Sequence, residues 1–266
     1  MIVHTAKIEY TTQSKPIRIK PIADVHAGSA HCDEKAFLKW LNEDKECWFV
    51  GNGDLMDMVI ASDSKRYRKS SDGTDGDDIV DEQIRKIYRW LEPHKDRIIG
   101  LGTGNHEDAI TKHHGTNPTK RLCEILGCTF LGYSWLLQIL FSKNGGGGRT
   151  VVIRGSHGWG GGSRTIGGDL TKYSKDIAHW EADVFLYGHV HKLQTDRIPR
   201  LAIGSRSNKL VAKEQLIGLT GSFLRTYSNT ADPTYAEMKG YPPIGIGGLT
   251  LNVQVTEDGR KIWFDS

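Results

Sequence analysis

The sequence predicts an α/β protein, and three observations support this prediction. In the first half of the chain, short apolar runs typical of buried strands alternate with segments whose apolar residues recur at helical spacing. After Cys128 the pattern changes to successive strands with one predicted helix among them. The 266 residues, 38% of them hydrophobic, are enough to bury a large core. Because no repeat or clear boundary divides the chain, residues 1–266 are expected to form a single domain.

Two strand-to-helix units occupy the N-terminal third of the chain. Residues 16–26 are predicted to form an apolar strand that ends in polar residues, and residues 33–46 follow as a helix. Residues 47–54 repeat the strand pattern as a short buried run that also ends in polar residues. The helix predicted over 77–92 has one apolar face, made by Ile79, Val80, Ile84, Ile87 and Leu91.

The rest of the chain continues with strands and shorter helices. The strand predicted at 97–107 again runs into polar residues, and Asn117 is the expected N-cap of a helix beginning near Pro118. Beyond this helix the pattern predicts a β-hairpin, whose glycine-rich turn at 145–148 is looser than the tight hairpin turns. A helix at 169–180 and further strands complete the predicted order of elements.

Composition and charge narrow the function classes only slightly. Lys and Arg number 35 against 32 Asp and Glu, so the formal net charge of +3 does not identify a nucleic-acid partner. The N-terminus lacks an apolar signal core and no apolar run approaches a membrane span, so a cytoplasmic location without a membrane partner is expected. Four cysteines without C-x-x-C spacing are expected to be reduced structural thiols: Cys32, Cys47, Cys123 and Cys128.

Asp, His and Asn residues collect at the ends of five predicted strands. Each cluster alone is also typical of a polar turn. The carboxyl ends of strands in an α/β sheet line the crevice where ligands bind, so five such ends favour one shared site over five unrelated turns. The last cluster, "GHVH", has histidines at positions i and i+2, which lean to the same side of an extended chain. In chain order the residues are Asp24, His26, Asp54, Asp57, Asn105, His106, His157, His189 and His191.

The ordered series D-x-H, G-D-x-x-D, G-N-H-E, H and G-H-x-H, over residues 24–191, resembles the calcineurin-like metallophosphoesterase superfamily. The resemblance implies a four-layer α/β/β/α sandwich, with two mixed sheets flanked by helices and a dinuclear metal centre at the sheet edge. It implies that one metal is held by Asp24, His26 and His191. It implies that the other is held by Asn105, His157 and His189, and that the carboxylate bridging both is Asp54.

The types of ligand atom agree with this implied site. Imidazole nitrogens, carboxylate oxygens and one amide oxygen, without thiolate, suit borderline to hard divalent ions. Two divalent ions are therefore expected, with Mn²⁺ preferred and Fe, Zn²⁺ or Ni²⁺ as alternatives. Two-metal sites hold their ions about 3.5–4 Å apart and lower the pKa of a shared water. A metal-bridging hydroxide is accordingly expected to attack phosphorus in line.

Two residues at the strand ends are expected to assist the leaving group. His106 directly follows Asn105 without being a ligand itself, so it is the expected general acid. Asp57 matches the family aspartate that hydrogen-bonds this histidine, and a carboxylate there would fix its tautomer and favour its protonated form. The alternative for Asp57 is a carboxylate at a helix N-terminus. Glu107 and Asp108 are expected only to shape the turn.

The sequence specifies the substrate less well than the metal site. Met58 stands where the serine/threonine phosphatases of the superfamily carry a phosphate-clamping arginine, which argues against a phosphoprotein substrate. Residues 62–78 form a loop in which Arg66 and Tyr67 could contact a phosphate backbone and stack on a base. Acidic residues follow at once, so a solvated loop is the alternative.

Three further residues are candidates for substrate binding. His113 and His114 could reach a substrate phosphate, with a surface helix end as the alternative, and Trp159 could form an aromatic wall for a base or leaving group. Together these features predict a dinuclear-metal-dependent phosphodiesterase acting on DNA or nucleotides. The alternatives are a phosphomonoesterase and a non-catalytic interaction scaffold of the same fold. The sequence does not specify the oligomeric state.

Overall fold

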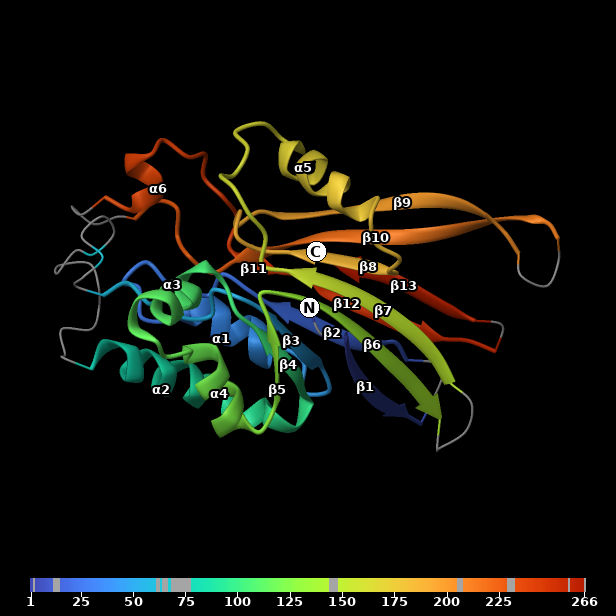
Figure 1. The fold of residues 1–266 in the computed structure, drawn as a ribbon, viewed down its shortest axis with the longest axis horizontal. Coiled ribbons are helices and arrows are strands. Elements are labelled where there is room, and N and C mark those ends of the chain that lie inside the picture. The colour runs from blue at the N-terminus through green and yellow to red at the C-terminus, as the bar shows by residue number, and fades with distance from the viewer. Residues whose placement is uncertain are drawn as a thin grey trace.

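The computed structural model describes residues 1, 3–11, 15–60, 63, 67, 78–143, 148–204, 208–228, 233–257 and 259–265. Two mixed β-sheets pack face to face, and helices cover their outer faces, as Figure 1 shows. This architecture is the four-layer α/β/β/α sandwich that the sequence predicts.

The six-stranded sheet contains the first three predicted strands side by side. Its strand order is β13-β12-β2-β3-β4-β5, and the four strands from β2 to β5 are parallel. Their carboxyl ends therefore point to the same edge of the sheet. The strands are β2 (Ile17–Ile22), β3 (Trp48–Asn52), β4 (Ile98–Gly102), β5 (Thr129–Gly132), β12 (Thr250–Val255) and β13 (Arg260–Asp265).

The seven-stranded sheet lies against the first and has the order β1-β6-β7-β8-β10-β11, with β9 paired to β10. Within it β7, β8 and β10 are neighbours that run parallel, so β7 and β8 end at the same edge. The strands are β1 (Val3–Tyr10), β6 (Ser134–Lys143), β7 (Gly148–Ser156), β8 (Val184–Tyr187), β9 (Leu193–Ile203), β10 (Leu210–Ser222) and β11 (Gly247–Gly248).

The structure differs from the sequence pattern in two strands. The segment from Cys128 to Phe141 reads as one hairpin strand, but it forms β5 and β6, which belong to different sheets. Gly132, with φ of +84°, allows the chain to turn between them. Strand β1, which the pattern does not predict, pairs with β6 along its whole length. The predicted β6–β7 hairpin is present, but its glycine turn lies outside the described residues except for Gly148.

The helices begin and end close to their predicted positions. Asn117 Oδ1 accepts a hydrogen bond from Lys120 N at 2.8 Å and so caps its helix as predicted. The pattern does not predict α3, α6 or the 3-10 helix η1. The helices are α1 (Glu34–Asn42), α2 (Ile79–Leu91), the 3-10 helix η1 (Glu92–Arg97), α3 (Asn105–His114), α4 (Pro118–Leu126), α5 (Gly168–Ile177) and α6 (Tyr235–Met238).

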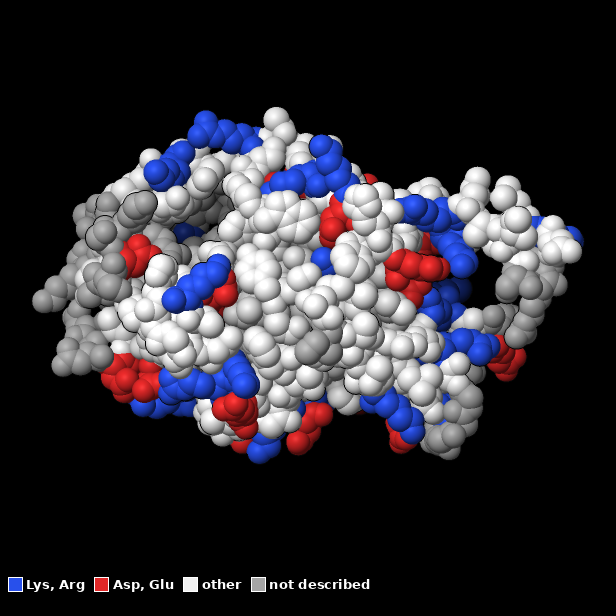
Figure 2. All heavy atoms as spheres, viewed as in Figure 1, with Lys and Arg blue, Asp and Glu red and all other residues white. Residues whose placement is uncertain are grey.

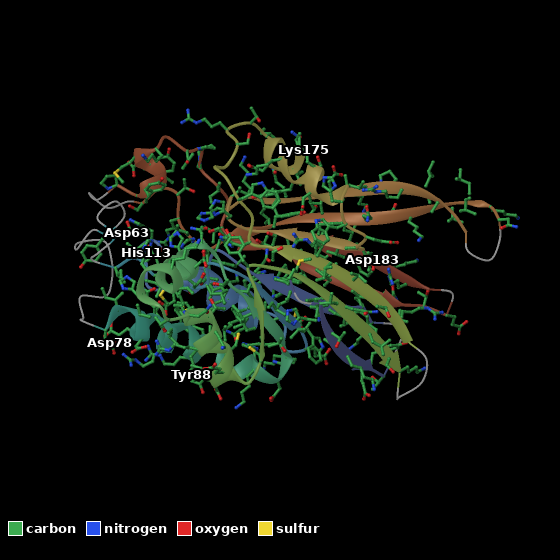
Figure 3. All side chains as sticks on the ribbon, viewed as in Figure 1. Asp63, Asp78, Tyr88, His113, Lys175 and Asp183 are labelled. Carbon is green, nitrogen blue, oxygen red and sulfur yellow. The ribbon has the colours of Figure 1, made fainter. Side chains whose placement is uncertain are left out.

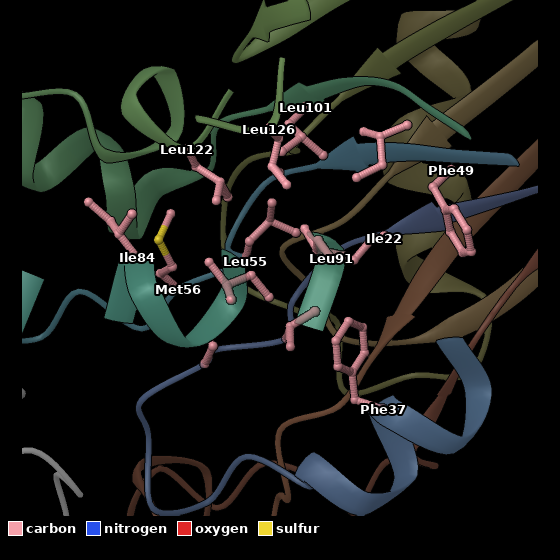
Figure 4. Close-up of a cluster of buried hydrophobic side chains, with 14 of the residues drawn as sticks. Ile22, Phe37, Phe49, Leu55, Met56, Ile84, Leu91, Leu101, Leu122 and Leu126 are labelled. Atoms are coloured by element: carbon pink, nitrogen blue, oxygen red, sulfur yellow. The ribbon is translucent and has the colours of Figure 1, made fainter. Parts of the chain in front are cut away.

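Three apolar clusters hold the layers together. One joins α1, α2 and α4 to the six-stranded sheet and includes Phe37, Ile84 and Leu122 (Figure 4). A second fills the space between the sheets, and a third packs α5 against β8 and β10. Both sheets are thus fixed relative to each other by burial of apolar surface, the main favourable contribution to folding. No helix among the described residues is long and apolar enough to cross a membrane.

Candidate metal centre

The carboxyl ends of five strands, three from one sheet and two from the other, meet at one edge of the sandwich. The six-stranded sheet contributes the residues that follow β2, β3 and β4, which are Asp24, His26, Asp54 and Asn105. The seven-stranded sheet contributes those that follow β7 and β8, which are His157, His189 and His191. All seven residues that the sequence predicts as ligands therefore lie on the same edge.

The first predicted ligand group is assembled across the two sheets. His26 Nε2 and His191 Nε2 face each other at 3.2 Å, and His191 Nε2 lies 3.3 Å from Asp24 Oδ1. One ligand atom from each of these residues lies within 4.8 Å of the other two. Two imidazole nitrogens and a carboxylate oxygen at this spacing could hold one divalent ion.

The second predicted group surrounds Asp54 and Asn105. His157 Nε2 lies 3.1 Å from Asp54 Oδ2 and 3.0 Å from Asn105 Oδ1. His189 Nδ1 lies 2.7 Å from the same amide oxygen. Asp54 Oδ2 is also 3.9 Å from His26 Nε2 in the first group. Asp54 thus lies between the two groups, where a carboxylate shared by two ions would be needed.

Five of the site residues have left-handed backbone conformations, which are uncommon for residues other than glycine. Their φ angles are 50° at Asp24, 52° at His26, 50° at Asp54, 71° at His189 and 60° at His191. Such conformations cost of order 1–3 kcal/mol each and persist where the surroundings hold them. Here the turns are held by one another, because Asp24 N and His26 N donate to carbonyl oxygens of the β3 turn at 3.1 Å.

Glycine is required where the turns pack most closely. A Cβ atom on Gly104 would lie 2.1 Å from Asp54 Oδ1 and 2.4 Å from Asp54 N. Gly53, with φ of +94°, would bring a Cβ to 2.6 Å from Gly104 N and 2.7 Å from His157 Nδ1. The spacing of the turns, and with it the position of Asp54, therefore depends on the absence of side chains at these positions.

The outer ring nitrogens of two predicted ligands are held by oxygen atoms. His26 Nδ1 lies 3.0 Å from Asp57 Oδ1, and His157 Nδ1 lies 2.9 Å from the carbonyl oxygen of Asn52. Hydrogen bonds of this kind place the proton on Nδ1 and leave the Nε2 lone pair free for a metal ion. The residues present therefore fit a metal centre in both the inner donor atoms and the groups that orient them.

Charges within the site perturb several pKa values. Burial acts against ionisation of Asp54, but the charges on His157 and His106 outweigh it and hold the Asp54 pKa well below its usual range. Although burial would lower it, the pKa of His157 is raised to about 10 by the charge on Asp54. Burial lowers the pKa values of His26 and His189, so neutral imidazole is favoured there. Neutral imidazole and ionised carboxylate are the forms that bind metal.

His106 and Asp57 lie beside the ligands, but their contact differs from the expected one. The Asp57 carboxylate is nearer to the metal-ligand candidate His26 than to His106, because Asp57 Oδ1 lies 3.0 Å from His26 Nδ1 and 3.8 Å from His106 Nδ1. His106 Nδ1 instead donates to the main-chain oxygen of Asp57. His106 Nε2 lies 3.9 Å from Asp54 Oδ2, so this edge of the ring faces the predicted metal centre.

Glu107 has a larger structural role than the expected shaping of one turn. Its Oε2 accepts hydrogen bonds from Asp54 N at 3.1 Å and Gly104 N at 2.9 Å, and its Oε1 accepts from Met56 N at 3.0 Å. Complete burial and the charge on Asp54 raise the Glu107 pKa to about 7. Glu107 thereby ties the β4 turn to the β3 turn. Glu107 is the last residue of the G-N-H-E motif, but the motif does not indicate which main-chain nitrogens its carboxylate binds.

Trp159 does not take the position expected of a substrate wall. Its ring packs edge-on against Tyr173 and Tyr187, at centroid distances of 5.0 and 5.9 Å. The following residues, Gly160 to Gly162, line the cavity beside the metal centre, whereas Trp159 does not. The three rings form a separate aromatic cluster under α5.

The other predicted substrate residues also lie away from this cavity or cannot be placed. His113 and His114 are exposed at the C-terminal end of α3, where Figure 3 labels His113, and neither lines the cavity. Tyr67 is half-buried, and its main-chain nitrogen donates to Asp63 O at 2.9 Å. Arg66 and most of the predicted 62–78 loop lie outside the described residues.

A cavity of about 420 Å³ opens beside the candidate metal centre. The site residues on one side of it include Asp54, Asn105 and His106, together with the three histidines His26, His189 and His191. Much of the remaining lining comes from residues within 224–226 and 233–244. Figure 2 shows the surface hollowed between α6 and α3.

Comparison with known proteins found similar solved structures but no similar sequences. No protein-family model matches the chain. No curated protein matches it either. Among solved structures, a double mutant of Vps29 from Entamoeba histolytica is 15% identical, with 94% of this chain and 98% of that chain covered and a TM-score of 0.39.

Two further structures show the same low level of similarity. A predicted phosphoesterase from Streptococcus pneumoniae is 12% identical over 94% of this chain and 98% of its own, with a TM-score of 0.33. GAP50, the anchor in the inner membrane complex of Plasmodium, is 11% identical over 95% of this chain and 85% of its own, with a TM-score of 0.41. At these values the similarities decide nothing about the chemistry of this chain. Its resemblance to the calcineurin-like metallophosphoesterase superfamily rests on its own motifs, its two-sheet sandwich and the seven candidate ligands gathered at the sandwich edge.

Proposed function

We propose that this protein is a dinuclear-metal-dependent phosphoesterase that prefers phosphodiesters, with nucleic acid or nucleotides as the substrate class. The observation that carries this proposal is the convergence of seven nitrogen- and oxygen-bearing side chains from two sheets, around the shared carboxylate of Asp54. Five of the seven have strained backbone conformations, as is common where a functional site fixes the chain.

In this proposal the donor atoms divide into two sets. One ion would be held by Asp24, His26 and His191, and the other by Asn105, His157 and His189, with Asp54 shared. The mixture of imidazole, carboxylate and amide ligands suits borderline to hard divalent ions, and the proposed ion is Mn²⁺, with Fe, Zn²⁺ and Ni²⁺ as alternatives. When bound, such ions supply a nucleophile from water near neutral pH and offset the charge on phosphoryl oxygens.

His106 is the proposed general acid. Its Nδ1 donates to the main-chain oxygen of Asp57, so Nδ1 must carry a hydrogen and Nε2 is the atom that gains or loses a proton. Nε2 faces the site near Asp54 and the side chain is 15% exposed, so it borders the cavity where an ester would bind. A proton on Nε2 can pass to the oxygen of the departing alcohol.

The proposed preference for diesters is supported by the charges around the cavity. A monoester carries a second negative charge that an extra cation would stabilise, but Met58 stands at the position where an arginine would provide it. Among the described residues, two long basic side chains line the cavity, and both contact carboxylates. Arg225 lies 3.0 Å from Asp33, and Lys192 lies 2.8 Å from Asp169.

We test this proposal by loading the protein with Mn²⁺ and comparing its turnover of the diester bis(4-nitrophenyl) phosphate with that of the monoester 4-nitrophenyl phosphate. We expect faster turnover of the diester; faster turnover of the monoester would make the protein a phosphomonoesterase. Metal analysis after dialysis should find two ions per chain. A protein that holds no metal and hydrolyses neither ester would be a non-catalytic scaffold, and the proposal would be wrong.

A further inference from the structure

The cavity beside the metal centre has a wall that the ligand motifs do not supply. We call residues 224–228 and 233–244 the wall segment. It follows β10 directly, and the last residues before it contact a candidate ligand: Phe223 N donates to Asp24 O at 3.0 Å, and Ser222 Oγ donates to the same oxygen at 2.9 Å. The start of the wall is therefore fixed relative to the candidate metal centre.

Internal hydrogen bonds give the wall segment a defined shape. Tyr227 Oη donates to the main-chain oxygen of Tyr241 at 2.9 Å, and Ile244 N donates to Thr226 Oγ1 at 3.2 Å. Thr234 caps α6 by accepting from Glu237 N at 3.0 Å, and its own hydroxyl donates to Thr226 O. The two threonines are buried, at 7% and 3% exposure. These hydrogen bonds hold the wall segment in one conformation, so it presents a fixed surface to the cavity.

The surface that lines the cavity is largely apolar. Met238 is 47% exposed and Tyr235 is 54% exposed, although both are large and mainly apolar. Apolar side chains left open beside a polar site are typical of small-molecule pockets, where they take up the apolar part of a ligand. The apolar lining includes Val59, Leu224, Pro233, Met238, Pro242 and Ile244.

Size and charge both distinguish among possible esters. A volume of about 420 Å³ falls within the range of about 300–1,000 Å³ found for small-ligand pockets. Successive phosphates of a polynucleotide need free cations along their path. Among the described lining residues, the guanidinium of Arg225 makes two hydrogen bonds to Asp33, and Lys192 contacts Asp169. The cavity thus suits one phosphate at the metal centre and a compact uncharged group beside it.

We propose that the wall segment binds the alcohol part of a small phosphodiester and selects a compact apolar or aromatic ring over a charged polynucleotide strand. This inference rests on the proposed function for the phosphate end of the ligand. Met238 and Tyr241 are the specificity-determining side chains, since both line the cavity from the segment that the ligand motifs do not include. Neither contributes an atom to the candidate metal groups.

Binding of two phosphonates separates the inference from the proposed function. Methylphosphonate and phenylphosphonate carry the same phosphonate group, but only phenylphosphonate has a ring. The ratio of their affinities for the Mn²⁺-loaded protein therefore measures how strongly the wall segment binds the ring. By calorimetry we expect phenylphosphonate to bind at least tenfold more tightly, because burying a ring removes apolar area from water. Met238→Ala and Tyr241→Ala should each reduce this ratio at least threefold and leave methylphosphonate binding unchanged. Leu201→Ala, at an exposed apolar position on β9, is the matched control.

Each outcome has one meaning. If methylphosphonate binds and the ratio is near one, the inference is overturned while the phosphate site of the proposed function stands. A single-stranded oligonucleotide that binds more tightly than phenylphosphonate would also overturn it, in favour of a polynucleotide substrate. Loss of binding for both phosphonates would refute the proposed phosphate site and with it this inference.

Discussion

Replacing Gly104 by alanine tests whether backbone packing fixes the candidate bridging carboxylate. The φ and ψ angles of Gly104 are −108° and −173°, in the extended region that alanine adopts without strain. The whole effect of the substitution must therefore come from the added methyl group. Its carbon would lie 2.1 Å from Asp54 Oδ1 and 2.4 Å from Asp54 N.

The size of the effect follows from these distances. Cβ atoms essentially never approach other heavy atoms within 3.0 Å, so the Asp54 carboxylate must move by about 1 Å. Asp54 Oδ1 would then lose the hydrogen bond that it accepts from His106 N at 2.9 Å. Overpacking of a dense interior costs about 1–3 kcal/mol, which lowers the melting temperature by roughly 2–12 °C in a chain of this size. A displacement of about 1 Å at a catalytic group can cost about 100-fold in turnover.

Three measurements on Gly104→Ala check this reasoning: thermal unfolding, metal content after dialysis, and turnover of bis(4-nitrophenyl) phosphate with Mn²⁺. Gly259→Ala is the control, because a Cβ there meets no atom within 4 Å and the position lies between β12 and β13. We expect metal content and turnover to fall only in the Gly104 variant. Wild-type metal content together with turnover within twofold of the control would show that the contact does not position Asp54.

Three further predictions concern the residues around the ions. His106→Ala should lower turnover by about 10²–10⁴-fold while metal content stays constant, because the residue is a proposed acid and not a ligand; unchanged turnover would remove it from the mechanism. Asp57→Asn should weaken metal binding by about 10–100-fold, measured by titration, because Asp57 Oδ1 orients His26 at 3.0 Å. A loss of turnover with unchanged metal affinity would instead place Asp57 in the proton transfer. Metal binding should release at least one proton per chain at pH 8, because the His157 pKa is raised to about 10 by Asp54 in the metal-free protein. Rising pH removes this competing proton, so metal affinity should increase about tenfold per unit between pH 7 and 9, and a flat profile would contradict the pairing of His157 with Asp54.

The sequence predicted well which edge of the sheets carries the candidate ligands, because this prediction requires only the positions where the strands end. Within each sheet the polar residues after β2, β3 and β4, and those after β7 and β8, lie at one edge because parallel strands end together. The packing of the two sheets then brings the two edges to the same side of the sandwich. The partner of Asp57 was harder to predict. Spacing places Asp57 near both His26 and His106, and only the left-handed turn at His26 brings that ring to the carboxylate.

Other elements depended on contacts that no local pattern records. The alternation in β1 resembles that of any half-buried segment, and its place beside β6 is set by pairing over a long separation. The break between β5 and β6 falls at Gly132, between two mostly apolar segments, and the local pattern does not indicate that these segments belong to different sheets. The wall segment is mostly irregular, with α6 as its one described helix. Its shape depends on hydrogen bonds between residues distant in the chain, which no local sequence pattern indicates.

The division of the candidate ligands between two sheets has a consequence for the order of assembly. His26 and His191, whose Nε2 atoms lie 3.2 Å apart, are 165 residues apart in the chain. Closing a loop of this length costs chain entropy, and proteins with many such non-local contacts fold slowly, so we expect this pair to form late in folding. Metal binding would therefore be a late step of folding, and metal content would measure the fraction of chains in which the two sheets have packed correctly.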